Sequence, residues 1–262
     1  MKTIVLLNFI FILGGYFFDI IAFKSYTHRF GFNGVFKSNA EASYFYMLII
    51  TLFYISKEKY SRIFLAVGLL STLFIGSKTL YFFLLIFGCL IVYNKVQCKI
   101  RDSYIKFFRA IFFIIAILIF SLGVVFIIKQ NATLNRLYTD KGLFTAFLST
   151  RDILVENAFA EMFTNWSFVH YFIGGIGSIS LTTQTDFIDL FLNYGIIGSI
   201  IYIIIFILNT YSYTNLKVLL LVSPVLASML LRGNFIHFPS VFLISMIIFV
   251  VINKIYKKEG YD

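Results

Sequence analysis

Charged residues are scarce in this chain, and their scarcity excludes a water-soluble globular domain. Asp, Glu, Lys and Arg make up 13% of the 262 residues, whereas soluble domains carry about 25%. Hydrophobic residues account for 60% of the chain, with 34 Phe and 17 Tyr, and the mean hydropathy is +0.91. This composition predicts an all-α protein whose helices lie in a lipid bilayer.

Cysteine is almost as scarce. Cys89 and Cys98 are the two cysteines of the chain, and their spacing is not that of a metal site. The topology argued below puts both near the cytoplasmic surface, where thiols stay reduced. No pair of His, Cys or carboxylate side chains has metal-site spacing either. We therefore expect neither a disulfide framework, nor a metal, nor a cofactor.

Long apolar runs separated by charged segments organise the chain. A spanning helix needs about 20 apolar residues, and fewer where neighbouring helices support it. The run 63–94 is interrupted at Gly76-Ser77-Lys78-Thr79, and we interpret it as two short helices. The sequence predicts a polytopic transmembrane helix bundle with about eight spans, forming one membrane domain over residues 1–262. The expected spans are 3–23, 42–56, 63–76, 80–94, 110–128, 188–208, 218–231 and 238–253.

The basic residues set the orientation. The formal net charge of +10 suggests nucleic acid at first sight, but most of the 22 Lys and Arg residues lie between apolar runs. By the positive-inside rule they place both termini in the cytoplasm and the long polar region 129–187 outside. We expect no nucleic-acid partner.

Basic residues on the outer side oppose this orientation and need another reason to be there. Arg29, Lys78, Arg151 and Arg232 each lie near Gly, Ser or Asn, in segments expected to be broken backbone. Irregular backbone at membrane depth is tolerated mainly where it lines a cavity. Together these residues would form a cationic pocket for phosphate or diphosphate. The alternative is that each one is an anchor for lipid headgroups.

The outer region contains a helix start and a glycine-rich loop. Residues Ser149 to Asp152 fit a capping box, and the sequence predicts an interfacial helix after them. The alternative is an amphipathic packing helix. The following loop contains Gly174, Gly175 and Gly177 and is not a dinucleotide fingerprint. We interpret it as a flexible segment that can approach a ligand closely.

Two acidic residues lie where the chain re-enters the membrane. Asp186 and Asp189 are three apart, so on a helix they share one face. A carboxylate at that depth is costly and is a functional candidate by default. The alternative is a salt bridge to one of the outer arginines. We expect His28 and His170 to be ordinary loop histidines.

Six segments, in this order and spacing, resemble the O-antigen polymerase and ligase superfamily, whose multi-spanning members assemble surface polysaccharides on undecaprenyl diphosphate. They cover nearly the whole chain, from residue 29 to 240. The segments are RFGFNGVFKSNAEAS at 29–43, GSKTLYFFLLI at 76–86, STRDILVENAFAEMF at 149–163, FIGGIG at 172–177, TDFIDLFLNYGIIGSI at 185–200 and RGNFIHFPS at 232–240.

The resemblance implies a glycosyltransferase of the bacterial inner membrane. It would transfer a growing glycan from undecaprenyl diphosphate to a new lipid-linked repeat unit, alongside a chain-length regulator and a flippase. The product would be O-antigen of lipopolysaccharide, capsule or exopolysaccharide. We expect Asp186 or His237 to act as the base, with Arg151 also catalytic. The remaining expected contacts are Arg29, Lys78, Arg151 and Arg232 on the diphosphate, and Asn39, Ser77, Gly175 and Asp189 elsewhere on the substrate.

Departures from the family pattern keep alternatives open. Lys78 stands where the family has Arg, so a bidentate contact is lost there. The histidine that ligases carry before the re-entry helix is replaced by Thr185-Asp186, which favours a polymerase. Members commonly have more spans, so we expect a short or N-terminally shortened member. The alternatives are a ligase, a flippase or transporter for lipid-linked sugars, and an accessory protein without chemistry.

Overall fold

The computed structural model describes residues 1–25, 30–56, 58–97, 118, 125, 128–129, 132–175, 183–211, 216–233, 235 and 239–258. Over these residues the chain is helical, and the β-structure found there is one isolated bridge between Lys24 and Phe32. This confirms the all-α class. The chain forms two compact units, one made of 1–84 with 202–262 and the other of 85–201.

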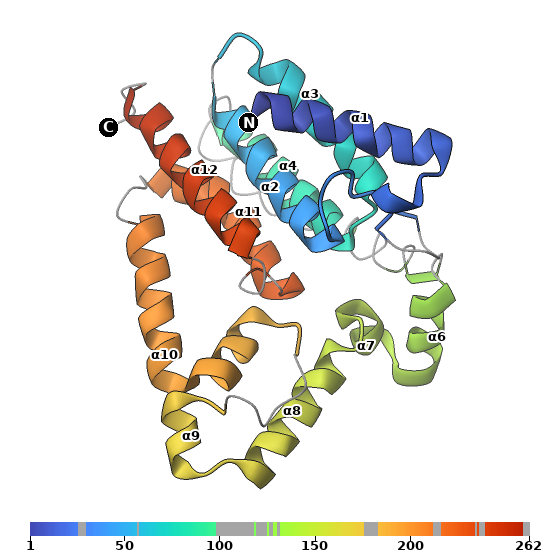
Figure 1. Ribbon diagram of the computed structural model, residues 1–262. Coiled ribbons are helices and arrows are strands. Elements are labelled where there is room, and N and C mark those ends of the chain that lie inside the picture. Colours follow the sequence, from blue (N-terminus) through green and yellow to red (C-terminus); the bar gives the residue numbers. More distant parts are fainter. Residues whose placement is uncertain are drawn as a thin grey trace. The chain divides into compact units, whose positions relative to one another are not determined.

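The first unit is built around a helix that is buried on all its faces. Helix α2 (Asn39–Ile55) is covered along nearly its whole length, and it contacts α3, α11 and α12 (Figure 1). A helix that is apolar all round is stable only when neighbours cover it. The surrounding helices are α1 (Lys2–Phe18), α3 (Ser61–Ile75), the start of α4 (Lys78–Gln97), α11 (Leu216–Arg232) and α12 (Pro239–Lys258).

Local sequence explains where these helices begin and end. The Ser38 hydroxyl caps α2 by accepting a hydrogen bond from the Glu41 N–H at 3.2 Å. Gly76 ends α3 with a φ of +65°, a left-handed conformation that glycine adopts without strain. Asp19 ends α1 in the same region, so the expected span 3–23 is a helix followed by a short 3-10 turn, Ile21–Phe23.

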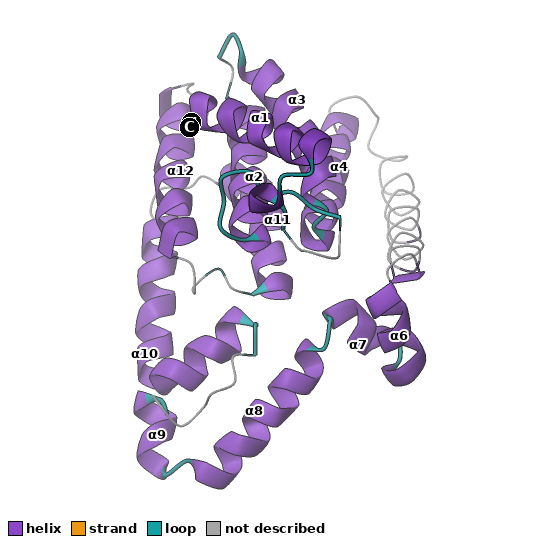
Figure 2. Ribbon diagram, turned by 45° about the vertical axis from the view of Figure 1, so that its right-hand side comes forward, coloured by secondary structure: helices purple, strands orange, loops and turns teal. Residues whose placement is uncertain are grey.

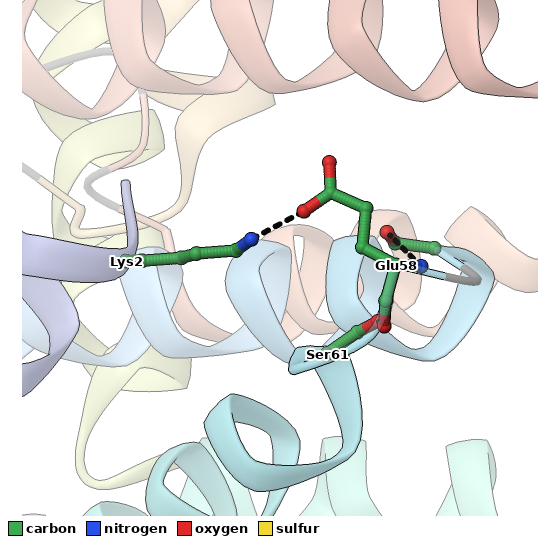
Figure 3. A network of polar contacts seen from close by, with 4 residues as sticks. Lys2, Glu58 and Ser61 are labelled. Atoms are coloured by element: carbon green, nitrogen blue, oxygen red, sulfur yellow. Dashed lines mark hydrogen bonds and ion pairs between the residues drawn. The ribbon is translucent and has the colours of Figure 1, made fainter.

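An ion pair closes one end of the first unit. Lys2 at the start of α1 pairs with Glu58 in the turn between α2 and α3 (Figure 3). The Ser61 hydroxyl, at the start of α3, donates to the Glu58 carbonyl at 2.5 Å. Both segments were expected on the cytoplasmic side. The ion pair shows that α1 begins at the end of the unit where α2 ends and α3 begins.

The second unit contains short helices and one long, broken helix. Its core is formed by Ala158, Met162, Trp166 and Leu192, which join α8, α9 and the start of α10 (Figure 2). The non-helical backbone of Gly195, with φ +65° and ψ −170°, breaks α10. The helices are α6 (Ala132–Lys141), α7 (Leu143–Leu148), α8 (Arg151–Asn165), α9 (Phe168–Ile173) and α10 (Asp186–Tyr211), whose last residues belong to the first unit.

Helix α8 starts where the sequence predicts it, but the prediction of a capping box there is wrong. Ser149 and Thr150 both have positive φ angles, and no side-chain hydrogen bond from Thr150 caps α8. Ser149 is the residue that ends α7, so its backbone cannot also adopt the extended conformation of a capping residue. Asp152 is used differently, because its carboxylate accepts a hydrogen bond from the Thr145 hydroxyl at 2.5 Å.

One helix among the described residues is long and apolar enough to cross a membrane, namely the stretch Asp186–Leu208 of α10. Within that stretch, 17% of the most apolar window is buried in the protein. Several shorter apolar helices coincide with expected spans, while the expected span 110–128 lies almost wholly outside the described residues. The shorter apolar helices are Lys2–Phe18, Ser61–Ile75, Lys78–Val92, Leu220–Met229 and Val241–Ile252.

Candidate functional site

Three segments that are far apart in sequence meet at one end of the first unit. The Phe32 N–H donates to the Phe74 carbonyl at 2.9 Å. The Asn39 side-chain amide donates to the Ile75 carbonyl at 2.9 Å. The Tyr44 hydroxyl, which is fully buried, donates to the Gly233 carbonyl at 2.7 Å. The loop before α2, the break between α3 and α4, and the turn after α11 are thus joined around the start of α2.

Asn39 is the centre of this polar cluster. Its side chain is 6% exposed, and the amide also donates to the Ser25 hydroxyl at 3.2 Å. Ser25 in turn donates to the Asn33 side chain. The Ser43 hydroxyl donates to the Asn39 carbonyl at 2.6 Å. Buried polar groups of this kind need partners, and the cluster gives Asn39 a defined structural role in addition to its expected contact with substrate.

Two glycines allow the segments to approach so closely. A Cβ atom on Gly31 would lie 2.7 Å from the Ile75 carbonyl oxygen, and one on Gly76 would lie 2.8 Å from the Phe30 carbonyl oxygen. Both obstacles are backbone atoms that cannot rotate away. The two glycines have positive φ angles as well. This explains physically why the motifs around residues 31 and 76 contain glycine.

Basic residues and helix ends lie in the same unit. Lys78 is the first residue of α4, directly after the buried Ser77, and Arg232 is the last residue of α11, directly before Gly233. The N-termini of α2 and α4 also belong to this cluster, and helix N-termini carry a partial positive charge that favours anions. Arg29 and His237 lie outside the described residues, and the Arg232 side chain is not described.

The predicted acidic residues are buried in the second unit. Asp186 is 4% exposed and Asp189 is 3% exposed, and both lie in the first turn of α10. One oxygen of Asp189 accepts hydrogen bonds from the Thr183 N–H at 2.6 Å and from its hydroxyl at 2.7 Å. A carboxylate at a helix N-terminus also interacts favourably with the helix dipole. Asp189 therefore holds the preceding loop against the helix.

The sequence predicts a glycine-rich loop that can approach a ligand closely; in the structure Gly174 and Gly175 approach other parts of the chain, and Gly177 lies outside the described residues. A Cβ atom on Gly174 would lie 2.3 Å from the Asn193 carbonyl oxygen. The Gly175 N–H donates to the Leu192 carbonyl at 3.1 Å. A Cβ atom on Gly175 would lie 2.4 Å from Trp166 Nε1. Gly174 and Gly175 thus fit against α10 just before the break at Gly195.

The expected site residues are divided between the two units. Asn39, Ser77, Lys78 and Arg232 belong to the first unit, and Arg151, Gly175, Asp186 and Asp189 belong to the second. Arg151 is the first residue of α8 and is half-buried.

Two side chains that form hydrogen bonds within the fold, Asn8 and His170, were not predicted to do so from the sequence. Asn8 is fully buried in α1, where its side chain donates to the Tyr46 hydroxyl at 3.0 Å and accepts from the Val35 N–H at 2.7 Å. A lone Asn within an apolar span was the available signal for this contact. His170, expected in a loop, instead forms a capping box with Ser167 at the start of α9.

Within the described part of the chain, no group of three or more His, Cys, Asp or Glu side chains could hold a metal ion. Comparison of the chain with models of protein families, with curated proteins and with solved structures finds no match. The class that the structure itself defines is an all-α protein with one described helix that could cross a membrane.

Proposed function

We propose that this chain is a multi-pass protein of the bacterial inner membrane that polymerises undecaprenyl-diphosphate-linked oligosaccharide repeat units at the outer face of that membrane. The product is a surface polysaccharide, either O-antigen, capsule or exopolysaccharide. Both termini lie in the cytoplasm, and about eight helices cross the bilayer.

The observation that carries the proposal is the meeting of three polar segments around the start of α2. The hydrogen bonds of Asn39 and Tyr44 join the segments that contain Lys78 and Arg232. The Lys2–Glu58 pair lies at the other end of α2, which is about 25 Å away along a helix of 17 residues. This separation supports a bundle with cations gathered on the side opposite to the termini.

The proposed reaction needs two contributions from the protein. The bond between the anomeric carbon of the growing glycan and its diphosphate breaks, and a glycosidic bond to the acceptor hydroxyl forms. The released undecaprenyl diphosphate carries the negative charge, which Arg29, Lys78, Arg151 and Arg232 stabilise. The acceptor proton passes to a base, for which Asp186 and His237 are the candidates. Each new linkage releases one undecaprenyl diphosphate.

The test replaces Arg151 with alanine in the living cell. We expect Arg151→Ala to abolish long-chain polysaccharide on a glycan gel while the protein stays in the membrane. Arg136 is the matched control, because its side chain is 85% exposed on α6 and pairs only loosely with Asp140 at 3.6 Å. Arg136→Ala should keep the ladder. Normal polymer length in Arg151→Ala would refute the assigned role.

Deletion of the whole chain separates the rival activities. Loss of the ladder with a single repeat unit retained supports a polymerase. Loss of all attached glycan, with free polymer remaining, would instead identify a ligase. An unchanged glycan pattern would identify an accessory protein and refute the proposal.

A further inference from the structure

The long helix α10 is not one straight rod. At Gly195 it bends, and the part before the bend turns toward α8, where Ile188, Phe191 and Leu192 join the core around Trp166 (Figures 1 and 2). Only the part after Gly195 is available as a straight spanning segment. Its apolar stretch 196–208 rises about 20 Å, which is short of the roughly 30 Å of a hydrocarbon core.

The short helix α9 is fastened at this bend. A Cβ atom on Gly195 would lie 2.4 Å from the carbonyl carbon and oxygen of Phe172, and 2.5 Å from the Gly174 nitrogen. The Gly175 N–H satisfies the Leu192 carbonyl, one of the acceptors next to the break. In both views α9 lies beyond the bend, on the side away from residues 196–201 (Figures 1 and 2). Helix α9 therefore lies past the end of the 196–208 segment, on the other side of Gly195.

The exposed face of α9 is apolar. Phe168 is 77% exposed, Val169 56% and Ile173 62%. The helix has no Asp, Glu, Lys or Arg, and its single histidine is used in the capping box with Ser167. Polar residues stand at its outer corner, where Thr164, Asn165 and Ser167 are exposed.

The exposed residues of α10 after Gly195 are apolar as well. Ile197, Ile200 and Ile201 are 51%, 52% and 53% exposed, and they lie within six residues after Gly195. If residues 196–208 cross the bilayer, these isoleucines face lipid. The six residues of α9 add about 9 Å to the roughly 20 Å of that stretch, which together match the hydrocarbon thickness.

From this match we propose that α9 is membrane-embedded, with its Phe168, Val169 and Ile173 face in the acyl chains of the outer leaflet. The span is then composite, made of α9 and the part of α10 after Gly195. The first half of α10, with Asp186 and Asp189, branches from it within the outer leaflet, about 9 Å below the outer end of the span. The sequence had placed residues 168–173 in the polar outer region. The inference rests on the proposed topology and not on the proposed reaction.

Nitroxide depth measurements test the inference in proteoliposomes of phosphatidylethanolamine and phosphatidylglycerol. Cys89→Ser and Cys98→Ser give a cysteine-free background. Single cysteines are then placed at exposed positions, so that the label does not disturb packing. The positions are Phe168 and Ile173 on α9, Ile197 and Ile201 on α10 as lipid references, and Glu156 on α8 as an aqueous reference. Collisions with oxygen report lipid, and collisions with a nickel chelate report water.

We expect Ile173 to give the same oxygen-to-nickel ratio as Ile197, well above that of Glu156, and Phe168 to lie shallower by about 7 Å along the helix axis. A nickel-accessible Ile173 beside a lipid-exposed Ile201 would overturn the inference and leave the topology intact. Nickel access at Ile173 and also at Ile201 would overturn the inference and the proposed topology. Protection of Ile173 from both reagents would show that protein covers α9, and would also overturn the inference.

Discussion

The junction between α9 and α10 gives the sharpest prediction of stability, through the substitution Gly195→Ala. Gly195 has φ +65° and ψ −170°, a region that is essentially restricted to glycine. The added methyl group would also lie 2.4 Å from the Phe172 carbonyl group and 2.5 Å from the Gly174 nitrogen. All these obstacles are backbone atoms, so no side-chain rotation relieves them.

The two effects add to a measurable loss. A residue forced into such a backbone conformation costs about 1–3 kcal/mol. Overpacking against fixed atoms costs about 1–3 kcal/mol more. The sum of roughly 2–6 kcal/mol is a large share of the free energy of unfolding of an ordinary domain, about 5–15 kcal/mol.

The assay is thermal unfolding in detergent of the protein fused to a fluorescent protein. After heating at each temperature, size-exclusion chromatography measures the fraction of the fusion that still elutes as folded protein. We expect Gly195→Ala to lower the Tm by about 5 °C or more. Gly14→Ala is the matched control, because nothing lies within 4 Å of the added atom on α1, and alanine has the better helix propensity. Equal Tm values for the two variants would refute the described junction.

Three further predictions concern the polar cluster and the acidic residue. Tyr44→Phe should cost about 1 kcal/mol in the same unfolding assay, because the buried Gly233 carbonyl loses its donor, whereas Tyr60→Phe at a 51% exposed position should cost nothing measurable. Asn39→Leu should destabilise by about 1–3 kcal/mol, since the Ile75 carbonyl loses its partner, and a Tm within error of the wild type would contradict this. Asp186→Asn should shorten the polysaccharide ladder to single repeat units on a glycan gel while the protein stays in the membrane, and a full ladder would exclude this residue as the base.

Much of the helix pattern could be predicted because apolar runs end at charged residues. The run 42–56 and α2 agree closely, and Ser38 caps the helix where the polar loop ends. The interruption at Gly76 was also predictable, since Gly-Ser-Lys-Thr breaks the apolar run. These signals are local, so the sequence carries them directly.

The features that escaped prediction depend on contacts between distant segments. Gly195 lies in an apolar run, and glycine is tolerated within membrane helices, so its sequence context does not reveal the bend. The bend requires Gly174 and Phe172, more than twenty residues earlier, to fill the space beside it. The capping box at Ser149 failed for a related reason, because the same residue ends α7. The burial of Asn39 could not be predicted either, because its side chain is paired with the Ile75 carbonyl, which lies 36 residues later in the chain.

The most direct test of the proposed function is reconstitution of the purified chain in liposomes with a lipid-linked single repeat unit as its sole substrate. We expect a ladder of longer lipid-linked glycans, with one undecaprenyl diphosphate released for each new linkage. Movement of an unchanged single repeat unit across the bilayer, or no change in the substrate at all, would contradict it.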